Sequence, residues 1–249
     1  MKRKKYNFIF SIGEACSCTQ ALRQQGLQNA SYPFDWLYGS TFVERCKILA
    51  DEFKYFIRKE DLEFAYSYDV SGLTSDAYHN KLNGIIFNHD FSNSLEFEEA
   101  YPLVKEKYDR RIKRLLEKIK NSKSVLAVYL ETPTTGHSEI SNQEIFQGYS
   151  ILREKFGDKI SLLYIKNNKG ETVIEEFENG KIIKVIGDYK DYDSELDYQV
   201  KRLEIIAIFC KLGLNNWFNV YTKKFLRSLI KRLIYSEELK QKCVKYFKL

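Results

Sequence analysis

One cysteine and one histidine in this chain have the sequence setting that covalent catalysis requires. Cys16 comes shortly after the apolar run Phe8–Phe10, and His89 follows the apolar run Ile85–Phe87. A cysteine acts as a nucleophile at neutral pH when a base or a cation activates it, and histidine is the usual base. The chain has only three histidines, so the choice of partner is narrow. The pair predicts thiol catalysis; the alternatives are a structural thiol beside a surface histidine, or His137 as the base.

A tight turn separates the first apolar run from a helix expected over residues 16–26. A cysteine at a helix N-terminus lies in the partial positive charge of the helix dipole, which lowers the pKa of the thiol. The backbone N–H groups of such a turn can cradle an oxyanion or a phosphate, although the full glycine-rich phosphate pattern is absent here. The residues assigned to this cradle are Ser11, Gly13, Glu14 and Ala15.

A third group should orient the histidine. Asp35, in the segment Pro33–Trp36, is the first candidate, and it either orients His89 or shapes the pocket. Asp90 is the second, because neighbouring residues on a strand point to opposite faces. Asp35 could equally close an Asx turn that fixes its own loop. The predicted substrate contacts are Arg23, for an anionic group, together with Trp36, Asn88 and Asp90.

The cysteines argue against a metal site and against a disulfide framework. Cys16-Ser17-Cys18 supplies two thiols, but no second Cys/His pair follows at zinc-binding spacing, so we expect no metal and no cofactor. Cys18 could instead resolve an oxidised Cys16. The five cysteines are odd in number and irregular in spacing, which fits a reducing compartment.

Apolar runs of strand length alternate with helical patterns along most of the chain. The clearest buried strands are expected at residues 6–12, 124–130 and 159–165. Asn179-Gly180 predicts a hairpin. Residues 54–83 have a weaker period, and residues 66–68 and 71–72 within them are expected to form a loop or an insertion. The pattern predicts an α/β fold, a three-layer, mainly parallel sheet with helices on both faces and a β-hairpin insertion. Since the carboxyl ends of parallel strands converge on one edge, Cys16 and His89 are expected to meet there.

Helix boundaries can be placed from capping signals. Thr41 with Glu44 and Ser141 with Glu144 have the spacing of capping boxes, and Gly26 is a plausible C-terminal stop. A long helical pattern covers residues 94–121, which Pro102 could break.

Charge is concentrated at the end of the chain. The net charge is +6, and residues 220–249 carry seven Lys, two Arg and two Glu, so the rest of the chain sums to about −1. We expect an α/β domain over 1–219 and a basic amphipathic helix over 220–249. This helix either packs on the domain or contacts an anionic membrane surface or an assembly partner. The near-neutral body argues against nucleic acid as a partner. No run has the length of a transmembrane helix or of a signal peptide, so a cytoplasmic protein is expected, whose tail could touch the inner face of the membrane.

Several motifs together resemble one bacterial family. They are SIGEAC at residues 11–16, PFDW at 33–36 and GIIFNHDF at 84–91. The chain resembles the family DUF1796, described as papain-like cysteine peptidases. The resemblance implies that Cys16 is the nucleophile and His89 the histidine of the site. It also implies an association with surface polysaccharides, and thus a glycan-linked substrate. The alternating strands and helices also look like SGNH-hydrolase-like acyl-transfer domains, in which Ser11 would compete with Cys16 as nucleophile.

Three functions are therefore predicted for this chain. The first is cysteine-dependent acyl transfer or hydrolysis on a glycan-linked or carrier-linked substrate. The second is a transferase that binds phosphorylated or nucleotide-linked sugars, with the first turn holding phosphate and Cys16 structural. The third is a non-catalytic module of polysaccharide-assembly machinery.

Overall fold

The computed structural model describes residues 5–70, 73–131, 140–190, 200–216 and 225. His137 lies outside the described residues, as does the predicted basic helix over 220–249 apart from residue 225. Within them, no helix has the length and apolar character needed to cross a membrane.

The larger sheet, sheet A, contains the buried strands expected from the sequence. It runs in the order β1 (Phe8–Ser11), β6 (Val125–Leu130), β7 (Ile160–Asn167), β9 (Ile182–Gly187) and β8 (Val173–Phe177). The first four strands are parallel, and β8 pairs antiparallel with β9. The turn between β8 and β9 has positive φ at Asn179 and Gly180, so the predicted hairpin is confirmed.

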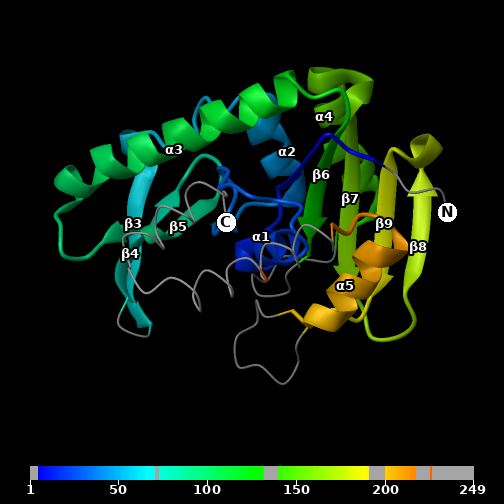
Figure 1. The fold of residues 1–249 in the computed structure, drawn as a ribbon. Coiled ribbons are helices and arrows are strands. Elements are labelled where there is room, and N and C mark those ends of the chain that lie inside the picture. Colours follow the sequence, from blue (N-terminus) through cyan, green and yellow to red (C-terminus); the bar gives the residue numbers. More distant parts are fainter. Residues whose placement is uncertain (1–4, 71–72, 132–139, 191–199, 217–224, 226–249) are drawn as a thin grey trace.

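Helices cover both faces of sheet A (Figure 1). They are α1 (Ala15–Gln24) and α5 (Arg202–Lys211) on one face, and α2 (Phe42–Ala50) and α4 (Asn142–Phe156) on the other. Alternate side chains of β6 point to the two faces of sheet A. Leu126 shares a core with Leu22 of α1, whereas Ala127 shares a core with Phe42 of α2. The predicted three-layer α/β arrangement is therefore confirmed.

A second sheet, sheet B, departs from the prediction. It is antiparallel, in the order β2 (Tyr38–Gly39), β5 (Ile85–Ser92), β4 (Leu73–Asn80) and β3 (Leu62–Val70). The loop or insertion expected at residues 66–68 is thus wrong, because these residues belong to β3, which pairs with β4; residues 71–72 lie outside the described residues. Most of β3 is exposed or partly exposed. Its sequence LEFAYSYDV nevertheless alternates apolar or aromatic residues with Glu63, Ala65, Ser67 and Asp69, the period of a strand, and the prediction did not use this signal.

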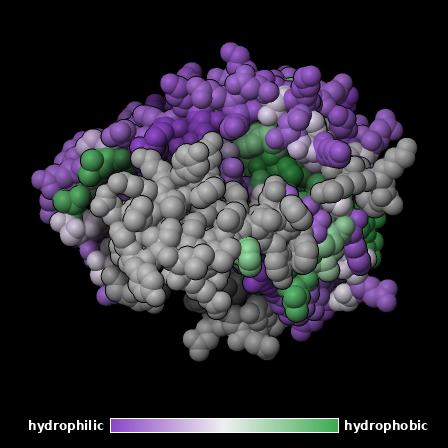
Figure 2. Space-filling view, viewed as in Figure 1, coloured by the Kyte–Doolittle hydropathy of each residue, from purple (hydrophilic) through white to green (hydrophobic). Residues whose placement is uncertain are grey.

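The long helix α3 (Phe97–Lys120) packs on sheet B and closes the core from that side (Figure 1). Its Tyr108 contacts Phe87 of β5, with ring centroids 5.2 Å apart. Pro102 does not break it, since the proline lies only in the second turn, where few backbone bonds are affected. The outward side of this helix is strongly hydrophilic (Figure 2).

The capping signals performed well. The Ser141–Glu144 capping box is present at the start of α4, and Thr41 accepts a hydrogen bond from Glu44 N at the start of α2. Gly26 has φ +66° just beyond α1, the left-handed conformation that ends helices.

Candidate functional site

The turn between β1 and α1 holds Cys16 at the start of the helix, as predicted. Ser11, Glu14 and Ala15 are all buried. The N–H of Gly13 donates to Ser11 Oγ at 3.1 Å, and the N–H of Ala15 donates to Leu37 O at 2.8 Å. These two donors of the predicted anion cradle are therefore engaged within the fold. Ser11 is fully buried and serves the turn, which does not favour it as a nucleophile.

The side chain of Arg45 holds this turn in place, and this role was not predicted from the sequence. It is fully buried on α2 and donates to three carbonyls: Gly13 O at 2.8 Å, Leu37 O at 3.1 Å and Gly39 O at 2.8 Å. Burial lowers the pKa of Arg45, and the charge of Glu14 opposes that change. One cation thus joins the thiol turn to the segment that forms β2. A charged residue on the otherwise apolar inner face of α2 was the signal that could have revealed it.

Cys16 itself is only 7% exposed. Burial raises the pKa of its thiol to about 11, while its own backbone N–H and the Tyr38 hydroxyl act in the opposite direction. The predicted lowering of this pKa is therefore wrong, because loss of solvent outweighs the helix N-terminus. A thiol with this pKa is protonated at neutral pH, so it needs a base at the moment of attack.

His89 reaches the site from sheet B and not from the edge of the parallel sheet. In the pairing of β4 with β5, Tyr78 lies opposite Phe87 and Asp76 lies opposite Phe91. Two extra residues of β5 therefore bulge from the ladder at Asn88–Asp90. Bulges redirect side chains and are frequent beside active sites.

The bulge sends Asp90 and His89 in different directions. The Asp90 carboxylate faces α3, where Lys107 Nζ lies at 2.5 Å and the Tyr108 hydroxyl at 2.7 Å. His89 is instead solvent-exposed and contacts Tyr68 of β3. Loss of solvent on the protein side lowers the pKa of His89, and the charge of Asp90 opposes this.

The hydroxyl of Tyr68 determines which nitrogen of His89 carries the proton. It contacts both the carbonyl oxygen of Asn88 and Nδ1 of His89. Burial raises the pKa of Tyr68 to about 12, so the hydroxyl is protonated at neutral pH. A carbonyl can only accept, so the single hydroxyl proton goes to Asn88 and the oxygen accepts from Nδ1–H. This leaves Nε2 of the neutral ring as the basic nitrogen.

Two tyrosines connect this histidine with the thiol. The Tyr68 hydroxyl lies close enough to Cys16 for the charge of the thiolate to raise the pKa of the phenol. On the other side, Tyr38 hydrogen-bonds the thiol and pairs with Ile86 of β5. Tyr68 thus contacts His89 and responds to the charge of Cys16, while no direct bond joins Cys16 and His89 among the described contacts.

Asp35 lies elsewhere. It is fully buried and accepts hydrogen bonds from Thr19 Oγ1 at 2.7 Å, Gln28 Nε2 at 2.7 Å and the N–H of Tyr32 at 3.0 Å. Burial raises the pKa of this carboxyl, and these hydrogen bonds oppose the rise. Among the described contacts none joins Asp35 to His89. Of its predicted roles, the structure matches the one in which Asp35 fixes its own loop.

The predicted substrate contacts fall into two groups. Arg23 lies over the ring of Trp36, 5.3 Å from the centroid, and donates to Ser31 Oγ at 2.8 Å. Asn88 belongs with the histidine, because its Oδ1 accepts from the Tyr66 hydroxyl at 2.9 Å. Asp90 is turned away from both groups by the bulge.

Comparison with known families gives one match. Residues 7–144 match the model of the family described as "putative papain-like cysteine peptidase (DUF1796)". The match covers more than half of the chain. The chain belongs to this family. No curated protein and no solved structure matches it.

The DUF1796 match contains the complete candidate site. It spans Cys16, His89 and the two tyrosines between them, and it ends within the first turn of α4. Strands β7 to β9 and α5 follow the matched region and complete sheet A. Cys18 also lies within the match, but it is 1% exposed and bonds Val128 O at 3.3 Å, and burial raises its pKa to about 12. That setting is typical of an inert core thiol rather than the resolving thiol considered from the sequence.

Proposed function

We propose that this protein is a cysteine-dependent hydrolase or acyl transferase, with Cys16 as nucleophile and His89 as general base. The observation that carries the proposal is the contact between the Tyr68 hydroxyl and Nδ1 of His89, a hydroxyl whose pKa also responds to the charge of Cys16. In this proposal Tyr68 orients the base, a role that was predicted for Asp35. Membership of a family described as cysteine peptidases supports the same class of reaction.

The proposed reaction proceeds by general-base catalysis. As Sγ of Cys16 attacks the acyl carbonyl, its proton passes to Nε2 of His89, and the carbonyl oxygen becomes an oxyanion. The protonated His89 then gives its proton to the leaving group, which leaves an acyl thioester on Cys16. Water or an acceptor hydroxyl attacks this thioester, with His89 again taking the proton. The C–S bond then breaks, the acid or the acylated acceptor is released, and His89 returns the proton to Sγ of Cys16. Because the N–H groups of Gly13 and Ala15 already donate hydrogen bonds within the fold, we assign stabilisation of the oxyanion to the Tyr38 hydroxyl, which already points at Sγ.

The substrate is proposed to be a glycan-linked or carrier-linked acyl group. Its support is the resemblance drawn from the sequence, together with the hydroxyl and amide groups of Tyr66 and Asn88 beside His89. Arg23 and Trp36 would contact an anionic part of such a substrate.

Acylation by a simple activated ester tests the chemistry without knowledge of the substrate. The protein is treated with p-nitrophenyl acetate, and acetylated cysteines are located by peptide mass spectrometry. We expect acetyl-Cys16, formed at least about 100-fold more slowly in His89→Gln, as is typical for loss of a general base. The exposed thiol of Cys210 reports the background rate in the same sample. His137→Gln tests the other base considered from the sequence. A rate that depends on His137 and not on His89 would overturn the assignment.

A non-catalytic role is the second candidate. One observation favours it: Cys16 is nearly buried and its pKa is raised, as in structural thiols. In that case Cys16 is acetylated no faster than Cys210 in any variant. A transferase for phosphorylated or nucleotide-linked sugars would instead be revealed by thermal stabilisation with a sugar nucleotide that survives Cys16→Ala.

A further inference from the structure

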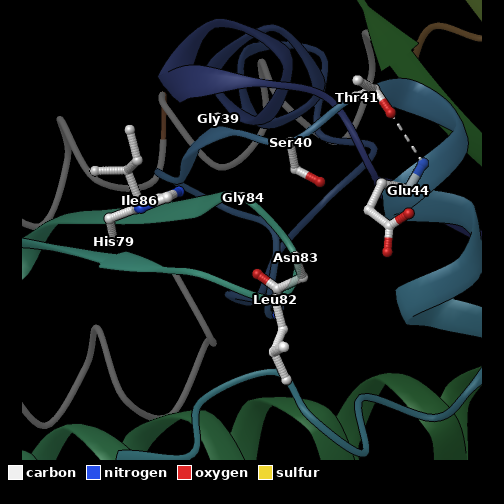
Figure 3. Close-up of a pocket in the computed structure, with 9 residues that line it drawn as sticks. All are labelled: Gly39, Ser40, Thr41, Glu44, His79, Leu82, Asn83, Gly84 and Ile86. Carbon is white, nitrogen blue, oxygen red and sulfur yellow. Dashed lines mark hydrogen bonds between the residues drawn. The ribbon is translucent and has the colours of Figure 1, made fainter. Parts of the chain in front are cut away.

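A second recess lies two residues beyond Tyr38, on the far side of the β2 segment. It is an open pocket of about 610 Å³ between the start of α2 and the turn that joins β4 to β5. Figure 3 shows its lining residues, which come from three segments of the chain. None of them is Cys16, His89 or a tyrosine of the candidate active site, so the pocket is a separate feature of the fold.

Ser40 is the unusual residue of this pocket. The residue is 93% buried, its Oγ has no hydrogen-bond partner among the described residues, and its hydroxyl points into the space between Glu44 and Asn83 (Figure 3). Buried hydroxyls almost always have a partner, because an unsatisfied one loses its bonds to water. Ser40 also has φ +68°, a conformation that glycine adopts freely and other residues rarely adopt. The chain keeps a serine where glycine would fit better, which points to a use for the hydroxyl.

The frame around Ser40 is fixed by other contacts. A Cβ on Gly39 would lie 2.1 Å from the carbonyl oxygen of Gly84, so the two turns touch backbone to backbone. Asn83 uses both ends of its amide, with Oδ1 accepting from the N–H of Ile85 and Nδ2 donating to Tyr55 O. The Ser40 hydroxyl is therefore held in place without being satisfied by its neighbours.

The charges around the pocket narrow the class of ligand. Among the described residues that line it, none is Lys or Arg, and the carboxylate of Glu44 lies on its wall, with one oxygen paired to Lys47 Nζ at 3.1 Å and the other left to accept from a ligand. A free anion is therefore disfavoured. A cation is disfavoured as well, because the pocket includes the N-terminus of α2, where the helix dipole is positive. Hydroxyl groups of a ligand suit both polar side chains of the pocket, since they can donate to the Glu44 carboxylate and accept from Ser40. Ile86 and the backbone of Gly84 add apolar surface against which a ring could pack.

We propose that this pocket binds a neutral, hydroxyl-rich molecule such as a single sugar unit. One ligand hydroxyl exchanges a hydrogen bond with Ser40 Oγ, and another donates to the carboxylate of Glu44. The volume suits one or two sugar rings, since pockets of about 300–1,000 Å³ hold small ligands. The assignment does not depend on thiol chemistry and holds whether or not Cys16 is a nucleophile.

The substitution Ser40→Gly tests the proposal without the risk that a loss of binding reflects misfolding. The substitution removes the hydroxyl and relieves the positive φ, so the variant should be at least as stable as the parent protein. Binding of glucose, N-acetylglucosamine and glycerol to the full chain is measured by saturation-transfer NMR. Sodium phosphate and methylammonium chloride, measured by competition, serve as the anionic and cationic probes. Ser150→Ala removes an exposed hydroxyl from α4 and is the matched control.

We expect at least one of the two sugars to bind the parent protein and Ser150→Ala equally. In Ser40→Gly and Ser40→Ala the affinity should fall about fivefold or more, the usual effect of one lost hydrogen bond. Binding should persist in Cys16→Ala and still depend on Ser40, which separates this site from the proposed catalysis. The proposal is overturned if neither sugar binds, if binding ignores the Ser40 substitutions, or if phosphate or methylammonium competes better than the sugars.

Discussion

Replacement of Tyr68 by phenylalanine separates an orienting role from a merely structural one. The change keeps the ring and removes only the hydroxyl that contacts His89 Nδ1 and Asn88 O. Without this acceptor the imidazole can rotate or adopt the other tautomer, in which Nε2 carries the proton and cannot act as a base. One hydrogen bond of this kind is worth about 1–1.5 kcal/mol, so we expect acetylation of Cys16 to slow by about tenfold.

The pH dependence gives the sharper readout. In the parent protein the rate should rise through the pKa of His89, which lies below its ordinary value because of desolvation, and then level off. The thiol begins to ionise unaided only near its own pKa of about 11, so the plateau covers neutral pH. The Tyr68 oxygen accepts from Nδ1–H and stabilises the protonated imidazole more than the neutral ring. Its removal therefore lowers the pKa of His89 further, and the rising limb should move to lower pH.

Tyr66→Phe is the control on the same face of sheet B. Its hydroxyl bonds Asn88 Oδ1 and not the imidazole, so its rising limb should coincide with that of the parent protein. The reasoning fails if Cys16 of Tyr68→Phe is acetylated at the parent rate and the rising limb of its pH–rate curve does not move. It also fails if Tyr66→Phe moves the limb equally.

Two further substitutions test the frame around the thiol. Arg45→Met removes the donors to Gly13 O, Leu37 O and Gly39 O and leaves Glu14 buried without this cation, so urea unfolding should show a loss of about 3–5 kcal/mol. Adding Glu14→Gln should recover part of that loss, and no recovery would contradict the electrostatic coupling between them. Asp35→Asn replaces one acceptor oxygen by an amide that faces the donors Thr19, Gln28 and Tyr32. It should lower stability by about 1–3 kcal/mol while the pH limb of Cys16 acetylation stays in place, whereas a moved limb would restore Asp35 as the orienting group.

The sequence was most informative where a single local pattern determines the structure. Strands buried on both faces appear as unbroken apolar runs, and β6 is buried along its whole length. Helix caps and the Asn179-Gly180 turn depend on neighbours within a few residues, and they were found. Sheet B was missed although β3 alternates apolar and polar residues over Leu62–Val70, the period of a strand, because its Tyr and Ser residues suggested a loop. Its existence depends on pairing with β4, which only the folded chain shows.

The candidate site likewise has features that could be predicted from the sequence and features that could not. The identities of Cys16 and His89 could be predicted, since each follows an apolar run and few residue types can do this chemistry. The route by which His89 arrives could not, because the bulge at Asn88–Asp90 exists only in the register between β4 and β5. The same bulge removes Asp90 from the site and gives Tyr68 its contact with the imidazole. Arg45 and Ser40 were missed for a related reason, since their roles depend on backbone groups that lie far apart in the sequence.

The segment from Tyr38 to Ser40 links the two proposed sites, and this makes a final prediction possible. Tyr38 hydrogen-bonds the thiol of Cys16, Ser40 faces the pocket, and Arg45 donates to the carbonyl of Gly39 between them. A ligand that orders Ser40 should therefore change how tightly Tyr38 covers Cys16, without touching the thiol. Alkylation of Cys16 by iodoacetamide should be slow at neutral pH, because the thiolate is scarce below a pKa of about 11. Saturation with the sugar that binds best should change this rate in the parent protein and not in Ser40→Gly, while alkylation of Cys210 stays constant. An equal change at Cys210 would indicate a general effect of the sugar on the solvent, and a change that persists in Ser40→Gly would place the ligand elsewhere.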